Sequence, residues 1–422
     1  MSSKAGTLAD VAAPMKNAIV GGPFGSNLVS KDYVPSGVPV IRGQNMGGKW
    51  VSGQFAFVSN DKAAQLSQNL ARPNDLVFTQ RGTLGQVAIV PSAPYDKYVV
   101  SQSQMKITVD PTKADVSFLY YLFKTPEQLQ YIFNAAIQTG VPHTNLGILK
   151  ATPLELPPLS VQKNIAAMVG AIDDRIALLR ETSATLEAIA QALFKSWFVD
   201  FDPVHAKQQG IPPAGMDEAT AALFPDSFEK SSLGLVPQGW QIKTLQDLLV
   251  LQRGFDLPTQ DRVHGAYPII AASGPSGFHQ EAMAKGPGVV TGRSGVLGRV
   301  FLELGDYWPL NTTLWVKEFR AAMPCYAYEV LRLLDFKAYN AGSAVPTLNR
   351  NHIHGLPYVI PPRAVMEAYE AIALQLHQRV RVNEQQAQTL ATLRDTLLPR
   401  LISGQLRLPL VEDAIAEATH AN

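Results

Sequence analysis

Val141-Pro142-x-x-Asn145 and Val345-Pro346-x-x-Asn349 open two stretches of the chain that align without a gap, residues 141–198 on residues 345–402. Upstream, Thr7-Leu8-x-Asp10 returns as Thr244-Leu245-x-Asp247. Two copies of one unit in a chain favour an internal pseudo-twofold repeat. Because duplex DNA has approximate dyad symmetry, a protein with two DNA-recognising domains is one natural use of such a chain. The matching framework residues are Pro153/Pro357, Pro157/Pro361, Pro158/Pro362, Val161/Val365, Arg175/Arg379, Leu186/Leu390 and Leu193/Leu397.

A heptad pattern follows the proline pair in each copy and predicts a long helix there. Ser160 is a suitable N-cap for the first helix, and Gly404 is a suitable end for the second. Apolar residues recur in alternating steps of four and three, which is typical of a coiled coil. The expected first seam is Ile172, Ile176, Leu179, Ser183, Leu186, Ala190, Leu193 and Trp197. The expected second seam is Leu376, Val380, Asn383, Ala387, Leu390, Arg394, Leu397 and Leu401.

Each helix taken alone could be a surface helix packed on its own domain, but two matching seams favour pairing with each other. Polar Asn383 and Arg394 would then help to fix the register at some cost in stability. A helix from Ser160 to about Phe198 is roughly 58 Å long. An antiparallel pair would hold two domains apart, one or more DNA turns from each other.

The segments between the seams predict an α+β chain of two mixed α/β domains separated by an antiparallel coiled coil. Strands are expected at 38–41, 75–79 and 86–90, and helices at 118–123 and 126–136. The predicted organisation is a first domain at 1–157, a helix at 158–198, a Pro/Gly-rich linker at 199–243, a second domain at 244–361, a helix at 362–405 and a tail at 406–422.

Composition narrows the class of protein. The chain has 422 residues, a net charge of +1 and 46% hydrophobic residues, which is typical of a globular protein with two or three domains. Any basic surface must therefore come from uneven placement of charge. The single Cys325, the lack of a signal peptide and the lack of an apolar run of about 18 residues predict a cytoplasmic protein away from the membrane.

The region after the first helix resembles a known family. Phe194-Lys195-Ser196-Trp197-Phe198-Val199-Asp200-Phe201-Asp202-Pro203-Val204 is similar to the central region of type I restriction–modification specificity subunits. Residues 221–228 and 233–240 and the Pro157-Pro158-Leu159-x2-Gln162 run continue the resemblance, which covers nearly the whole chain. The first copy lacks the Pro237-x-Gly239-Trp240 lead-in of the second.

The resemblance implies two target-recognition domains that each read half of a bipartite DNA site. It also implies two modification subunits that bind S-adenosylmethionine and methylate adenine, and, where present, two restriction subunits that carry the ATP- and Mg²⁺-dependent motor and nuclease. The specificity subunit itself contributes sequence reading and scaffolding, without catalysis and without a cofactor of its own. The partners expected are therefore double-stranded DNA and these subunits.

The motifs found in the chain agree with a non-catalytic role. We find no Asn-Pro-Pro-aromatic motif of amino-methyltransferases, because Pro157-Pro158 and Pro361-Pro362 have other neighbours. Trp50 follows Gly43-x4-Gly48-Lys49 where a phosphate-binding loop needs Ser or Thr. His352-x-His354 has no further ligand at metal-binding spacing, so no metal site is predicted. The alternative function is a coiled-coil adaptor with two protein-binding ends.

Polar clusters at matching places in the two copies are the candidates for DNA contact. Arg can bind guanine and Gln or Asn can bind adenine through two hydrogen bonds, and glycine lets backbone approach phosphate. The competing interpretation is plain turns and half-buried strand residues. The candidates in the first copy are Gln80, Arg81, Thr83, Gln102, Ser103, Gln104, Thr139, His143 and Thr144, with Arg42, Asn45 and Lys49 as weaker ones. Those in the second copy are Arg293, Ser294, Asn311, Thr312, Ser343, Arg350, Asn351 and His352. Asn145 and Asn349 recur at one position, which favours a shared structural turn.

Overall fold

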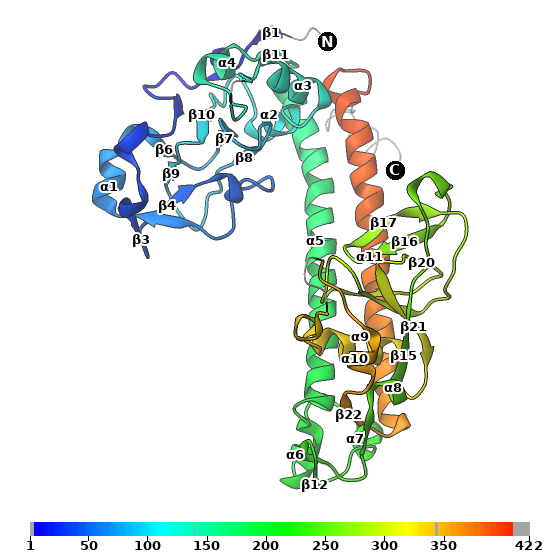
Figure 1. Cartoon of the computed structure of the whole chain (residues 1–422). Helices are drawn as coiled ribbons and strands as arrows, with labels where there is room; N and C mark the ends of the chain where they lie inside the picture. Colours follow the sequence, from blue (N-terminus) through cyan, green and yellow to red (C-terminus); the bar gives the residue numbers. More distant parts are fainter. Residues whose placement is uncertain (1–3, 139, 342–344, 408–422) are drawn as a thin grey trace, which may run out of the picture. The chain divides into compact units, whose positions relative to one another are not determined.

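A computed structural model describes residues 4–138, 140–341 and 345–407. The chain divides into two compact units, one made of residues 1–177 and 387–422 and the other of residues 178–386. Each unit holds a globular domain and a segment of both long helices, α5 (Leu159–Phe198) and α11 (Arg363–Ile402), which are visible in Figure 1. The boundaries of the two sequence copies therefore do not coincide with the boundaries of the two compact units.

The first unit is built on two sheets. A four-stranded antiparallel sheet has the order β2 (Ile19–Gly21), β10 (Gln104–Thr108), β7 (Asp75–Thr79), β8 (Val87–Ile89). A five-stranded sheet has the order β3 (Tyr33–Val34), β5 (Ala56–Val58), β4 (Val38–Ile41), β9 (Tyr98–Val100), β6 (Leu70–Ala71). The strand pair β1 (Lys4–Thr7) and β11 (Pro153–Leu156) leads into α5. The helices are α1 (Asn60–Gln65), α2 (Val116–Leu122), α3 (Pro126–Ala135) and α4 (Leu146–Ala151).

The second unit repeats the four-stranded sheet and changes its surroundings. The repeated sheet has the order β15 (Leu249–Arg253), β21 (Thr313–Phe319), β18 (Gly288–Gly292), β19 (Val300–Glu303). A second sheet has the order β17 (Gly274–His279), β16 (Tyr267–Ala271), β20 (Trp308–Pro309). The strand pair β14 (Gln241–Thr244) and β22 (Pro357–Ile360) corresponds to β1 and β11, and the domain helices are α8 (Leu245–Leu248), α9 (Pro324–Leu333) and α10 (Arg350–His354).

The repeated sequence motifs are helix caps. Asp10 accepts a hydrogen bond from the Thr7 backbone at 2.7 Å, and Asp247 accepts one from the Thr244 backbone at 2.9 Å. Asn145 caps α4 by accepting from the Ile148 backbone, as Asn349 caps α10 by accepting from the Asn351 backbone. These side chains satisfy backbone N–H groups that would otherwise lack partners at a helix start. The prediction of a shared structural turn at Asn145 and Asn349 is confirmed.

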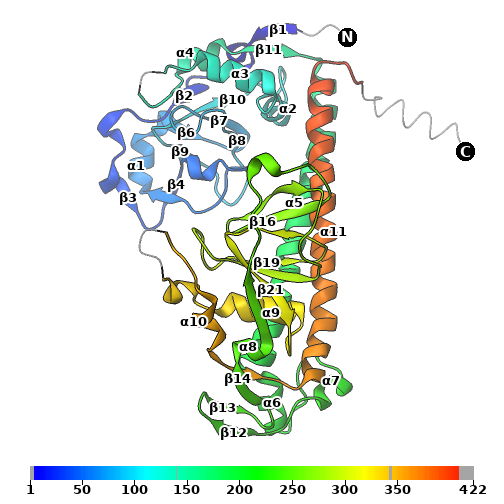
Figure 2. The same ribbon diagram turned by 45° about the vertical axis from the view of Figure 1, so that its right-hand side comes forward.

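The two long helices pair antiparallel within each unit, as predicted. In the first unit, Ile165 and Val169 of α5 share a core with Leu398 and Leu401 of α11. In the second, the end of α5 packs on the start of α11, where the Tyr369 hydroxyl donates to the Ala190 carbonyl at 3.3 Å. Figure 1 shows the two helices side by side in each unit, and in the turned view of Figure 2 α11 lies in front of α5. All predicted seam residues are buried or half-buried: Ile172, Ile176, Leu179, Ser183, Leu186, Ala190, Leu193, Trp197, Leu376, Val380, Asn383, Ala387, Leu390, Arg394, Leu397 and Leu401.

Polar residues interrupt both halves of the seam. In the first unit, Asp173 accepts hydrogen bonds from Arg394 at 2.6 Å and from Tyr121 of α2 at 2.9 Å, so one carboxylate joins both helices to the domain. In the second, Ser183 and Asn383 line a hollow of about 220 Å³. Neither the Ser183 hydroxyl nor the Asn383 amide bonds to another described residue. In the first unit the ion pair of Arg394 and Asp173 therefore links α5 and α11, whereas in the second unit a hollow lined by polar side chains lies between the two helices.

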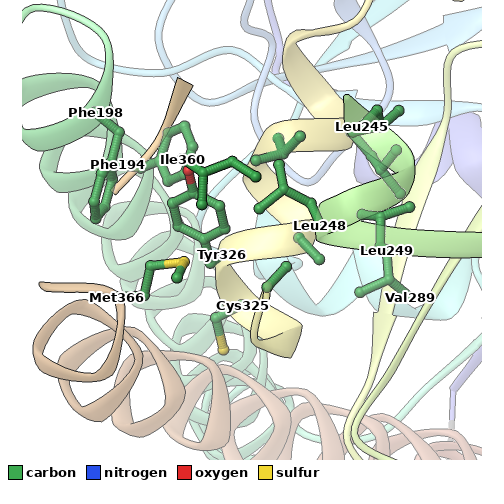
Figure 3. Close-up of a cluster of buried hydrophobic side chains, with 14 of the residues drawn as sticks. Phe194, Phe198, Leu245, Leu248, Leu249, Val289, Cys325, Tyr326, Ile360 and Met366 are labelled. Carbon is green, nitrogen blue, oxygen red and sulfur yellow. The ribbon is translucent and has the colours of Figure 1, made fainter. Parts of the chain in front are cut away.

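Aromatic packing joins α5, α9 and α11 in the second unit. Figure 3 shows Phe194 and Phe198 of α5 beside Tyr326 of α9, with Met366 of α11 on the same cluster. The ring centroids of Phe198 and Tyr326 are 4.9 Å apart in an edge-to-face arrangement. Such buried aromatic pairs add to the energy of burial and restrict the angle between the elements. The domain is thus anchored on both helices rather than tethered to them.

The segment between the copies is more ordered than a linker. It forms α6 (Asp202–Gln208), α7 (Glu218–Ala222) and the hairpin of β12 (Phe228–Ser231) and β13 (Gly234–Pro237). The segment predicted as a Pro/Gly-rich linker at 199–243 is ordered, with Val204, Phe224 and Trp240 buried in the core of the second unit. Their spacing is irregular, so no periodic pattern reveals it. Ser160 lies inside α5 rather than capping it, and α11 ends at Ile402 rather than at 405.

Candidate nucleic-acid interface

The three predicted clusters of the first copy lie side by side at one edge of the four-stranded sheet. Strands β2 and β7 end at this edge and β10 begins there, because β10 runs antiparallel to both. The backbone N–H groups of Gln80 and Arg81 donate to the Ser103 carbonyl at 2.7 and 3.2 Å. The Thr144 N–H donates to the Gln80 carbonyl at 2.9 Å, and Arg81 forms a β-bridge with His143. We call residues 22–28, 80–83, 101–104 and 140–145 the first loop edge.

Arg81 is the most available side chain of this edge. It is exposed, and its guanidinium makes no hydrogen bond or ion pair with any described residue. Gly82 follows with φ +101°, a backbone conformation that favours glycine and sharpens the turn. Thr83 is also exposed, while Gln80 and His143 are half-buried. None of the residues of the first loop edge is acidic, so it carries no carboxylate to repel a phosphate.

The second copy builds the same arrangement. The backbone N–H groups of Arg293 and Ser294 donate to the Thr312 carbonyl at 2.8 and 3.0 Å, and the Leu348 N–H donates to the Arg293 carbonyl at 2.8 Å. Ser294 also forms a β-bridge with Thr347. We call residues 253–256, 292–295, 311–313 and 345–352 the second loop edge. The two copies therefore place three matching loops at the matching edge of a matching sheet.

More side chains of the second loop edge than of the first form hydrogen bonds or ion pairs within the edge itself. Arg293 is half-buried and donates to the Asn311 carbonyl at 3.4 Å. Arg253 donates to Asp256 at 3.2 Å, and the Asn311 amide donates to the same carboxylate. Arg350 donates to the Leu251 carbonyl at 3.1 Å. Asn351 and His352 remain exposed.

Several predicted contact residues are internal. Gln104 is 1% exposed and bonds to Ser101, and Thr144 is 5% exposed. Asn45 is 1% exposed, and its amide donates to the Ser52 and Gln54 carbonyls. The side chains of Gln104 and Asn45 bond within their loops, and none of the three side chains is presented at the surface. Sequence alone did not distinguish them, because a polar residue at a strand end can point either way.

The side chains of other candidates either bond to the backbone of neighbouring loops or lie outside the first loop edge. The Gln102 amide donates to the Gly25 and Leu28 carbonyls at 2.5 and 3.0 Å. Lys49 lies over the rings of Trp50 and Tyr121 at 5.4 and 5.1 Å from their centroids. The half-buried residues are Arg42, Lys49, Ser103, Asn311 and Thr312, whereas Gln102 is exposed. Thr139 and Ser343 lie outside the described residues.

Two residues of the loop edges were missed from the sequence. Phe24 is 90% exposed on the turn after β2, beside the Gln102 brace. Asp256 follows β15 at the matching place in the second copy. The available signal was the run Gly22-Pro23-Phe24-Gly25, since glycine and proline favour a turn and a turn usually lies at the surface.

The described residues show no reactive centre at either loop edge. No cluster of three His, Cys, Asp or Glu residues that could hold a metal is found in the described part of the chain. Burial, aided by Glu370, raises the pKa of Cys325 and keeps its thiol protonated in the core. His354 is buried and accepts from the Leu251 backbone at 3.0 Å. No helix in the described ranges is long and apolar enough to cross a membrane.

Comparison with known proteins agrees with this geometry. Residues 27–188 match the family model of the type I restriction modification DNA specificity domain. The chain is 22% identical to the MjaIX specificity subunit of Methanocaldococcus jannaschii, over 92% of this chain and 91% of that one. It is 30% identical to the HindI specificity subunit of Haemophilus influenzae, over 36% of this chain and 42% of that one.

A solved structure shares the fold. The type I restriction–modification S subunit from M. genitalium superposes with a TM-score of 0.58 at 18% identity, covering 95% of this chain and 96% of that one. At this identity the likeness concerns the fold, including the two sheet-rich domains and the paired long helices. The chain is therefore similar over nearly its whole length to type I restriction–modification specificity subunits, and residues 27–188 match the model of their DNA specificity domain.

Proposed function

We propose that this chain reads a bipartite DNA sequence, with one loop edge contacting each half-site, and makes or breaks no bonds itself. The observation that carries the proposal is the repetition of one loop edge with different exposed side chains. A shared framework with different surface residues is what two independent readers in one chain require. Arg81 and Arg293 are the candidates for guanine or phosphate contact, since arginine binds both.

The chain would also scaffold a complex. By analogy with its relatives, it would recruit two modification subunits and, where they accompany it, two restriction subunits. S-adenosylmethionine, ATP and Mg²⁺ would bind those subunits rather than this chain. In this role the paired helices set the distance between the half-sites.

Exchange of one domain tests the proposal. Residues 1–157 are replaced by those of a relative, and the methylated motif of the host is mapped with the modification subunits present. We expect one half of the motif to change and the other to persist. The matched exchange of residues 244–361 should change the other half alone. If either exchange alters both halves, the domains do not read independently.

Binding by the chain itself separates DNA reading from an adaptor role. The full chain is incubated with a random duplex pool, with and without modification subunits, and the retained duplexes are sequenced. A DNA reader enriches a gapped motif, whereas a protein adaptor enriches none.

A further inference from the structure

Phe24 is the one large apolar side chain that the first loop edge holds almost wholly in water. It is 90% exposed, whereas the next most exposed large apolar side chain among the described residues is Leu235 at 63%. Single exposed apolar residues are common on protein surfaces. Phe24 differs from these in the way in which its turn is constructed.

The turn that carries Phe24 is held at both ends. The Gly22 N–H donates to the Gln104 carbonyl at 2.9 Å, and Pro23, which is buried, has a fixed φ. The Asn27 N–H donates to the Phe24 carbonyl at 3.0 Å, closing a turn of 3-10 helix over Gly25–Asn27. The ring is thus presented on a braced backbone rather than on a loose loop.

The brace links this turn directly to the candidate reading loops. The Gln102 amide holds the Gly25 and Leu28 carbonyls, and the Gln102 loop in turn bonds to Gln80 and Arg81 through Ser103. At Gly22 the two loops pass so closely that an added Cβ would lie 1.9 Å from the Ser101 carbonyl oxygen. Phe24 therefore projects from the same edge as Arg81, with its position fixed relative to the loop that carries it.

The second loop edge does not project a ring in this way, because its Phe255 is half-buried and packs on Trp308 and Trp315 with ring centroids 6.4 and 6.0 Å apart. The matching backbone N–H, that of Gly254, donates to the Thr313 carbonyl as Gly22 does to Gln104, which places Asp256 where Phe24 stands. Asp256 is engaged by Arg253 and Asn311, so its carboxylate closes the loop instead of projecting from it. The two edges share a framework but differ at this position in chemistry.

We propose that Phe24 inserts between bases of the first half-site, stacking on one of them and partly unstacking that step. An apolar wedge of this kind opens a base step, and an aromatic face stacks on any base without reading its edge. The inference rests on the proposed function. It predicts that base stacking is disturbed in the first half-site only, because the second loop edge has an aspartate at that place.

Fluorescence of 2-aminopurine tests the wedge. The full chain is bound to a duplex that the wild-type chain enriched from a random pool, with 2-aminopurine placed in turn at each adenine of the two half-sites. Wild-type chain should raise the fluorescence of one probe in the half-site that changes when residues 1–157 are exchanged, and of none in the other. Phe24→Ala should remove that rise and weaken binding by about 5- to 160-fold, the loss of one base–aromatic stack. Phe24→Trp should retain both.

Two controls make the result decisive. Phe278→Ala removes an exposed ring from the second unit, 53% exposed on β17, and should alter neither signal. Thermal unfolding of Phe24→Ala should match that of the wild type, since the ring makes little contact in the folded chain. If Phe24→Ala leaves fluorescence and affinity unchanged while the wild type still selects its motif, the wedge is wrong and DNA reading stands. If the wild type enriches no motif, the proposed function itself fails.

Discussion

Replacing Arg81 by alanine isolates the contribution of one side chain to DNA reading. Because the guanidinium is exposed and bonds to no described residue, its loss should leave the unfolding temperature unchanged. If it holds a base edge, its loss should cost about 1–3 kcal/mol, or about 5- to 160-fold in Kd. The loss should relax selection at one position of the first half-site only. If it holds a phosphate instead, affinity should fall alike for every sequence, and the slope of log K against log salt should shrink by about one.

Arg72 provides the matched control for this substitution. It is exposed and precedes β7, whereas Arg81 follows the other end of the same strand. Five strand residues separate the two ends by roughly 17 Å. Arg72→Ala removes the same charge from the same sheet and should leave both selectivity and affinity near those of the wild type. Competition binding with single-base variants of the enriched duplex, repeated over a salt series, measures all these quantities. Equal effects of the two substitutions, or none from either, would refute base or phosphate contact by Arg81.

Three further outcomes follow from the structure. Asp173→Ala strips Arg394 and Tyr121 of their shared partner and should destabilise the chain by about 1–3 kcal/mol in denaturant unfolding, whereas the exposed neighbour Asp174→Ala should change little. Burial raises the pKa of Glu303 to about 7, so this group favours the folded state below its unfolded pKa near 4.5 and loses that contribution as pH rises through 7. Glu303→Gln should flatten the fall in unfolding temperature over that window, and an unchanged pH profile would contradict the shift. Inserting one heptad before Ser183 and another after Asn383, about 10.5 Å of helix, should lengthen the gap in the methylated motif by up to about three base pairs. An unchanged gap would show that the helices do not set it.

The fold was accessible from the sequence because its main signals are periodic. The heptads gave the correct faces of α5 and α11, and the repeated Asn145/Asn349 gave the turns that begin α4 and α10. The ordered segment after α5 was not accessible, because its buried side chains follow no period.

The site was only partly accessible for a related reason. Glycine and arginine mark a turn in sequence, so the loop of Arg81 could be found. Whether a polar side chain points outward depends on contacts from other strands, which sequence does not display. Gln104 was therefore a candidate although it is buried. Phe24 was overlooked because aromatic residues are generally expected in the core, whereas this one is exposed.

The division of the long helices between the two units has a consequence for synthesis. Residues 178–386 form one continuous stretch, so every residue of the second unit is synthesised before the last segment of the first unit is added. The first unit is made first and finished last. Leu398 and Leu401 share its core with Ile165 and Val169, and all of the second unit is translated in between. A premature stop within the last turns of α11 should therefore damage the recognition domain at the opposite end of the gene and leave the nearer one folded.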